Sequence, residues 1–165
     1  MENSQAEHGS GGEKFASVVD QLPIALYELL GSRRFRWTER AEVPAKPGLY
    51  LLTEGGKPVY VGQTRNLRKR LTQHGALYSW SMSATFAFRI AKIEAKKRGL
   101  NTRRFNRKLE ADPEFAKLFV AAKQRVAAME AQVIQMEDPI TRTVFEVYAA
   151  VMLDTPKEYN DFQTH

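Results

Sequence analysis

"PGLYLLTEGGKPVYVGQTRNLRKRLTQH", residues 47–74, is the stretch that decides the fold of this 165-residue chain. Two apolar runs separated by a glycine turn predict a pair of β-strands. The basic segment that follows predicts a helix from Asn66 to His74, closed by Gly75. This short unit carries two tyrosines, an arginine and a histidine, and their relative placement decides what chemistry it can perform.

The two tyrosines share one face of the sheet for only one parity of strand pairing. A two-residue glycine loop pairs Tyr50 with Val61 and sends the tyrosines to opposite faces. A loop of odd length, or a bulge, pairs Tyr50 with Gly62 and places Tyr50 and Tyr60 together. If the tyrosines act together, we expect one of these two irregularities, with Gly62 letting a ligand or backbone approach closely.

Arg70 and His74 are four residues apart, so they lie on one face of the predicted helix. A guanidinium offers a planar fork to phosphate oxygens, and an imidazole or a phenol can move protons. With the tyrosines, these groups suit phosphate-ester chemistry. The structural alternatives are tyrosines that only pack, a solvated arginine and a histidine that only caps its helix.

The segment before this unit predicts a polar tail and a helical extension. Residues 1–13 contain almost no apolar side chain, which predicts disorder. Apolar periodicity between residues 14 and 30 predicts one or two amphipathic helices interrupted at Pro23, where a second helix would begin. The extension is expected to span residues 14–46.

The segment after it predicts further strands and helices around the same core. Alternation in "SATFAFRIAK", residues 83–92, predicts a third strand, and a basic helix is expected over about 93–109. Asp-Pro pairs at 112–113 and 138–139 each predict a helix start, with a short strand in residues 131–137 between them. We therefore expect an α/β (α+β) domain over residues 47–165 with a helical insertion at about 92–131.

The charge is unevenly distributed along the chain. The net charge is +6, yet residues 63–108 hold thirteen Lys or Arg and one acid, which gives +12 there and −6 elsewhere. A basic half favours a polyanionic partner, although a solvated helical surface would have the same composition. No cysteine is present, which excludes disulfides and thiolate metal sites. No membrane span or secretory signal is recognisable, so a cytoplasmic location is expected.

Two tripeptides in the opening stretch carry a family resemblance. Residues 48–50 (Gly-Leu-Tyr) and 60–62 (Tyr-Val-Gly) resemble the two motifs of the GIY-YIG nuclease family, each with one aliphatic change. Arg70 matches the family's catalytic arginine, and His74 matches a histidine of its restriction-enzyme branch. Glu146 and Asn160 match the metal-binding glutamate and the later asparagine. The resemblance covers residues 47–91 and 133–160, and favours the restriction-like branch.

The resemblance implies a small core with a three- to four-stranded, mainly antiparallel sheet flanked by helices. It also implies one Mg²⁺ or Mn²⁺ per site, held by Glu146. Tyr50 would be the general base, with its pKa lowered by nearby cations, and Tyr60 would orient water or exchange roles with it. Arg70 would neutralise phosphate charge. His74 would bind phosphate or assist proton transfer, and Asn160 would hold the geometry.

Several of these assignments have alternatives in the same sequence. Glu146 follows Arg142 by four residues and could be an ordinary helix ion pair, and Glu158 is the rival metal carboxylate. Asn160 could be a turn residue. Some relatives carry lysine at the position of Gln63, so tyrosine activation here would depend on Arg65, Arg68 or the metal.

The leading hypothesis is a divalent-metal-dependent endonuclease that hydrolyses nucleic acid, with DNA expected, in a restriction or foreign-DNA role. The alternatives are a structure-specific repair nuclease, a non-cleaving nucleic-acid-binding module on the same fold, and a basic helical interaction protein. Cutting two strands would need a homodimer or repeated encounters. The residues expected to contact the nucleic acid are basic: Arg65, Arg68, Lys69, Lys96, Lys97, Arg98, Arg103, Arg104 and Arg107.

Overall fold

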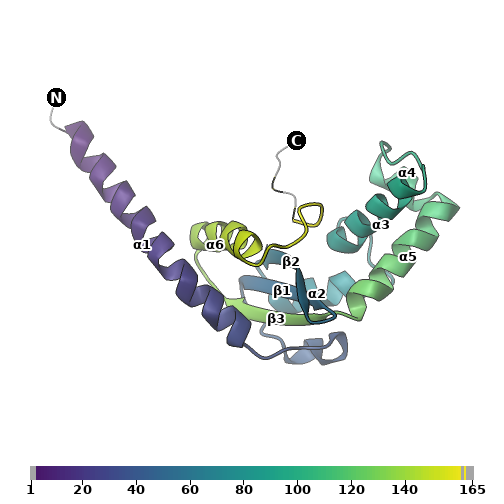
Figure 1. Ribbon diagram of the computed structural model, residues 1–165, viewed down its shortest axis with the longest axis horizontal. Coiled ribbons are helices and arrows are strands. Elements are labelled where there is room, and N and C mark those ends of the chain that lie inside the picture. The colour runs from purple at the N-terminus through teal and green to yellow at the C-terminus, as the bar shows by residue number, and fades with distance from the viewer. Residues whose placement is uncertain (1–2, 161, 163–165) are drawn as a thin grey trace.

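The structure is a computed structural model that describes residues 3–160 and 162, with side chains from residue 11 onward. Its centre is a three-stranded antiparallel sheet in the order β2-β1-β3. The strands are β1 (Gly48–Glu54), β2 (Lys57–Thr64) and β3 (Glu130–Gln135). Helices flank the sheet (Figure 1), so the expected mixed α/β class with a small antiparallel sheet is confirmed.

The β1–β2 hairpin combines a tight turn with a bulge. Gly55 and Gly56 both have positive φ, 56° and 80°, as a two-residue hairpin turn requires. The register shifts between Leu52 and Thr53, because Leu52 pairs with Tyr60 while Thr53 pairs with Pro58. Val59, the residue skipped on β2, is the bulge that shifts the strand pairing by one residue. Tyr50 therefore pairs with Gly62, and the two tyrosines share a face.

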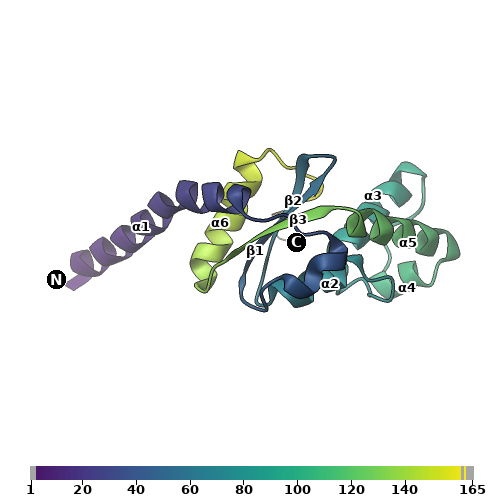
Figure 2. The same cartoon turned by 90° about the horizontal axis from the view of Figure 1, so that it is seen from below.

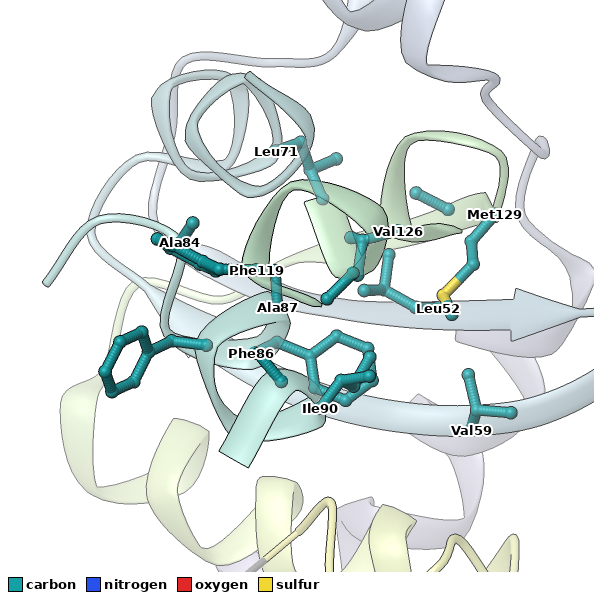
Figure 3. Packing of buried hydrophobic residues seen from close by; sticks show 14 of the residues in the cluster. Leu52, Val59, Leu71, Ala84, Phe86, Ala87, Ile90, Phe119, Val126 and Met129 are labelled. Atoms are coloured by element: carbon teal, nitrogen blue, oxygen red, sulfur yellow. The ribbon is translucent and has the colours of Figure 1, made fainter. Parts of the chain in front are cut away.

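One face of the sheet is covered by α2 (Leu67–Gly75), α3 (Thr85–Lys97) and α5 (Pro113–Ala127). Figure 3 shows this core, where Leu52 of β1 lies among Val126, Met129 and Ile90. The short helices η1 (Trp37–Glu42) and α4 (Asn106–Glu110) lie beside α2 and α5 respectively. Tyr50 belongs to this core, so the packing of the core positions the candidate site.

The opposite face is covered by α1 (Asn3–Gly31) and α6 (Pro139–Met152). Leu49, Leu51 and Val61 point to this side and pack with Phe145 of α6 and Leu29 of α1. The first half of α1 projects away from the sheet in both Figure 1 and Figure 2. Within the described residues, no helix is long and apolar enough to cross a bilayer.

The prediction of a third strand over residues 83–92 is wrong, because those residues form α3. Phe86, Phe88 and Ile90 do alternate, but Ala87 and Ala91 beside them are buried as well. Small residues recur at helical spacing and let α3 bury a broad face against α5. A short apolar run does not distinguish the two-residue period of a strand from the 3.6-residue period of a helix. The third strand is instead β3, which overlaps the stretch at 131–137 where a short strand was expected and begins one residue earlier.

The disordered tail expected at residues 1–13 also differs from the structure. From Asn3 onward the chain is helical and continues as α1, while residues 1 and 2 lie outside the described part. Pro23 lies inside this one helix rather than at the start of a second. The polar composition correctly indicates the absence of burial, since residues 11–17 are all exposed. A helix needs only its own backbone bonds, and Leu22 and Leu29 anchor it further along.

Candidate active site

The hydroxyl of Tyr50 is the point where the candidate site converges. Tyr50 is fully buried, and its hydroxyl oxygen lies 2.7 Å from Nε2 of His74 and 3.3 Å from Nε of Arg70. A guanidinium can only donate, so the Tyr50 oxygen accepts from Arg70. The Tyr50–His74 hydrogen bond runs in either direction according to which imidazole nitrogen carries the proton, and Nδ1 of His74 is buried with no partner among the described residues.

The helix α2 delivers Arg70 and His74 to this point because both of its ends are defined. Asn66 caps its start by accepting a hydrogen bond from the backbone N–H of Lys69 at 2.9 Å. Leu67 and Leu71 are buried against the core, which fixes the rotation of the helix. Arg70 and His74, one turn apart, then face the sheet. Both therefore meet Tyr50 of β1.

Arg70 is held by more than one partner. Its Nη1 donates to the carbonyl of Ser83 at 3.1 Å, and its Nη2 donates to Oγ1 of Thr85 at 2.7 Å. With Nε on Tyr50, three guanidinium nitrogens are engaged, and the side chain is only partly buried. Arg70 is therefore hydrogen-bonded within the protein and is not simply a solvated side chain. Arg70 is a fixed cation at the edge of the tyrosine cluster.

Tyr60 lies beside Tyr50 but in a different environment. The two ring centroids are 6.0 Å apart, and the Tyr60 ring stacks on Phe86 of α3 at 4.2 Å. Tyr60 keeps part of its surface exposed, whereas Tyr50 and His74 are enclosed. Of the two phenols, Tyr60 is thus the one open to a ligand from solvent.

Gly62 is the residue that makes room for this arrangement. A Cβ at position 62 would overlap the phenol of Tyr50 and crowd the ring of Tyr60. The glycine of the second tripeptide is thus required by the close packing of two tyrosine side chains over the strand, where the sequence had suggested the approach of a ligand or backbone.

Asn160 ties the C-terminal segment to the outer side of β2. Its Oδ1 accepts from the backbone N–H of Val61 at 3.1 Å, and its Nδ2 donates to the carbonyl of the same residue at 2.6 Å. Asn160 is buried although it follows α6 in a loop. It fixes the strand segment between Tyr60 and Gly62, which fits the geometric role expected for it.

Glu146 reaches the site from α6, which packs along β2. Its Oε2 accepts from Nε2 of Gln63 at 2.8 Å, and the same amide contacts Oγ1 of Thr143 at 3.1 Å. Arg142 does not pair with Glu146. It donates to Oε1 of Gln63 at 3.3 Å and to the carbonyl of Met136 at 3.1 Å. Glu146 is therefore oriented by an amide rather than neutralised by an ion pair.

Gln63 is the site residue whose role the sequence did not reveal. It stood out only as a departure from the lysine of some relatives, and its partners lie about eighty positions later on α6. It links β2 to α6 and holds the Glu146 carboxylate. The rival carboxylate, Glu158, is exposed in the C-terminal turn.

The electrostatics correct one expectation about Tyr50. Burial raises the pKa of Tyr50 well above its ordinary value, the neighbouring Tyr60 adds to the rise, and Arg70 opposes it. The pKa of Tyr50 was expected to be lowered by cations, and that expectation is wrong because desolvation outweighs the charge of Arg70. Burial also raises the pKa of Tyr60 and that of Glu146.

His74 is neutral in the folded chain, and this has a measurable consequence. Burial, helped by the charge of Arg70, lowers the pKa of His74 from 6.5 to about 3. Between these values the unfolded chain binds the extra proton, so stability is lost as the pH falls below 6.5. We expect this residue alone to cost about 2 kcal/mol of unfolding free energy between pH 7 and pH 5.

The measurement is urea unfolding at several pH values, for the wild type and for His74→Gln. The difference in stability between them should narrow as the pH falls from 7 to 5, because the variant has no imidazole to protonate. Parallel pH profiles for the two proteins would contradict the assignment of a buried neutral histidine.

The nine basic residues expected to contact nucleic acid are divided between two places. Arg65, Arg68 and Lys69 lie at the start of α2, and all three side chains are exposed. The other six lie in the last turn of α3, in the loop after it and at the start of α4, towards the far end of the molecule in Figure 1. Three of the nine have internal partners: Arg68 with the Val43 carbonyl, Lys97 with Glu94, and Arg104 with Asp112.

The donor set suits a hard divalent cation. Among the residues that the structure describes, no three His, Cys, Asp or Glu side chains are grouped as a metal site. Glu146 is a half-buried carboxylate whose charge acts on both Tyr60 and Arg70. Mg²⁺ is held by one or two carboxylates and keeps several waters, so a single glutamate fits it.

Comparison with known proteins gives local sequence matches. No family model matches the chain. A stretch of 31 residues, 19% of the chain, is 55% identical to UvrABC system protein C from Aquifex aeolicus. Another of 32 residues, also 19% of the chain, is 47% identical to the protein of the same name from Deinococcus radiodurans. The chain spans only 6% and 5% of the lengths of these relatives.

One solved structure is also similar. It is a point mutant of the GIY-YIG N-terminal endonuclease domain of UvrC from Thermotoga maritima, bound to its catalytic divalent cation. The similarity covers 74% of this chain and 91% of that one, at 16% identity and a TM-score of 0.38.

Proposed function

We propose that the chain is a GIY-YIG nuclease that hydrolyses nucleic-acid phosphodiester bonds with a divalent metal ion. The observation that carries the proposal is the convergence of Arg70 and His74 on the hydroxyl of Tyr50, with Tyr60 beside it. The local identity to UvrABC system protein C supports the family. A core packed only for stability has no need to bury a phenol, an imidazole and a guanidinium together.

The proton chemistry follows from the hydrogen bonds of Tyr50. Its raised pKa keeps the phenol protonated, so it acts as a base only by passing its own proton on. As the Tyr50 oxygen takes a proton from the attacking water, its hydroxyl proton moves to Nε2 of His74, 2.7 Å away. Tyr50 thus stays neutral, and protonation of His74 relies on the anionic phosphate to offset the burial and the Arg70 charge that lower the pKa of its imidazole.

Arg70 and Glu146 supply the remaining functions. The exposed part of Arg70 binds a phosphate oxygen and stabilises the charge that builds on it, while its other nitrogens stay on Ser83 and Thr85. Glu146, oriented by Gln63, would hold the metal, which when bound polarises the phosphate. Tyr60, the more accessible phenol, orients the water or the phosphate.

Two biological roles remain distinguishable within this activity. The pairing of Tyr50 with His74 favours the restriction-like branch, in which a histidine occupies the matching position. The local identity to UvrABC system protein C favours an endonuclease of the UvrC kind, which corresponds to the repair alternative. Cleavage of ordinary duplex plasmid supports the first role, and cleavage confined to branched or bubble-containing DNA supports the second.

The test of the activity compares the wild type with Glu146→Gln on plasmid, branched DNA, single-stranded DNA and RNA. We expect cleavage with Mg²⁺ or Mn²⁺ and none with EDTA. The amide removes the negative charge that holds the metal, so the rate should fall about 100-fold, equivalent to roughly 3 kcal/mol. The readout is the initial rate on a labelled substrate.

Glu158→Gln is the matched control, because Glu158 is an exposed carboxylate in the C-terminal turn. It should cut at the wild-type rate. If Glu158→Gln abolished cleavage and Glu146→Gln did not, the metal carboxylate would be Glu158. If the folded wild type cut none of the substrates with either metal, the nuclease proposal would fail.

A further inference from the structure

The loop between α2 and α3 presents large apolar side chains to solvent beside the candidate site. We propose that this loop, residues 77–82 and called the aromatic loop below, stacks on unpaired bases of a nucleic acid. The inference deepens the proposed function by naming the substrate class, single-stranded or strand-separated nucleic acid, and it rests on that function. Three features of the loop support it.

The first feature is the exposure of alternate side chains. Tyr78, Trp80 and Met82 are 81%, 74% and 79% exposed, while Ser79 and Ser81 between them are each 5% exposed. The loop thus turns its small polar residues inward and its large ones outward. This is the reverse of what core packing would select. Grouped exposed aromatic residues usually mark a binding surface.

The second feature is the firm attachment of the loop backbone. Lys123 of α5, itself buried, donates from Nζ to the carbonyls of Leu77 at 2.6 Å and Ser79 at 3.0 Å. The backbone N–H of Ser81 donates to Oε1 of Glu110 at 3.3 Å. A loop held from two helices presents its aromatic rings with little loss of freedom on binding.

The third feature is its connection to the candidate site. The carbonyl of Ser83, one residue beyond the loop, accepts from the same Arg70 guanidinium that contacts Tyr50. A strand whose phosphate lies on Arg70 would therefore have its neighbouring bases close to the aromatic loop.

The surrounding charge identifies the occupant as nucleic acid. The loop lies inside residues 63–108, which carry thirteen Lys or Arg and one acid. Aromatic rings set among cations are the chemistry by which proteins bind single strands, because the cations follow the backbone and the rings stack on bases. In an intact duplex the base faces are covered by their neighbours, so the loop selects unpaired nucleotides.

The test is binding in EDTA, where no cleavage is expected. The probes are a labelled single-stranded 20-mer of thymidine, its uridine RNA counterpart, and a duplex of equal length. Trp80→Ala and Tyr78→Ala should each weaken single-strand binding about 10-fold and duplex binding less than twofold. Trp80→Phe keeps an aromatic face and should keep most of the affinity. The two single-stranded probes decide whether the strand is DNA or RNA.

Tyr27→Ala is the matched control. Tyr27 is 81% exposed, as Tyr78 is, but it lies on α1 on the other side of the sheet. It should leave single-strand binding unchanged. All of these side chains are exposed, so melting temperatures close to the wild type are expected and confirm that each variant folds. A Trp80→Ala variant that binds single strands like the wild type would overturn the inference, as would equal losses on single strand and duplex.

A second readout is the intrinsic fluorescence of the protein, which has two tryptophans. Stacking of a base on Trp80 should quench it, and the quenching should be lost in Trp80→Phe. Because binding is measured without metal, the two proposals fail separately. A wild type that binds single strands through Trp80 but never cuts contradicts only the nuclease. If the protein cuts but its single-strand binding does not change when Trp80 is replaced, only the proposal about the aromatic loop is contradicted.

Discussion

Tyr50→Phe is expected to lower the cleavage rate about 1,000-fold, within the range found for loss of a general acid–base group. The change removes one oxygen atom, and that atom is the meeting point of Arg70 and His74. Without it, no hydroxyl lies between the attacking water and His74. The proton relay then has no path, although the phosphate can still bind Arg70.

The measurement is a single-turnover rate with saturating enzyme, so that weaker binding does not obscure the chemical step. Tyr27→Phe, which removes an exposed hydroxyl on α1, is the control and should cut normally. Tyr60→Phe separates the two phenols, because an orienting hydroxyl should matter less than a base. A larger loss for Tyr60→Phe would mean that the two exchange roles, and a loss of less than tenfold for Tyr50→Phe would contradict the relay.

Gly62→Ala is expected to lower the unfolding free energy by about 3 kcal/mol, the upper part of the range for overpacking. The added methyl would occupy the space of the Tyr50 phenol and press on Tyr60. Neither ring has an easy retreat, because Tyr50 is enclosed and Tyr60 is stacked on Phe86. Cleavage should fall together with stability, since the relay loses its geometry.

Gly31→Ala is the control for this change. A Cβ at position 31, the last residue of α1, would meet nothing within 4 Å. Urea unfolding should therefore show a stability within about 0.5 kcal/mol of the wild type, as for ordinary surface changes. If Gly62→Ala unfolded at the wild-type urea concentration, the close packing of the tyrosines over the strand would be contradicted.

Local signals predicted the hairpin and the helix that follows it better than they predicted the third strand. The hairpin, the α2 helix and both Asp-Pro helix starts follow from turn, capping and proline chemistry within a few residues. The parity argument on Tyr50 and Tyr60 correctly required an irregular hairpin. It could not choose a bulge over an odd loop, because Gly55 and Gly56 satisfy the turn geometry in either case.

The features that the sequence did not predict all depend on tertiary contacts. Residues 83–92 alternate like a strand, and only the position of α5 shows that their alanines are buried too. The pairing of Gln63 with Glu146 joins strands and helices eighty-three positions apart, and no local pattern contains it. The sign of the Tyr50 pKa shift depended on depth of burial, which a list of nearby cations does not reveal.

The contact between Asn160 and β2 has a consequence beyond the alignment of the site. β2 is an outer strand of the sheet, and outer strands leave backbone groups that another chain could join. The side-chain amide of Asn160 accepts from and donates to Val61 just as a neighbouring strand would. A single residue thus occupies the place of a fourth strand. The edge of the sheet beside Tyr60 and Gly62 is therefore protected from self-association.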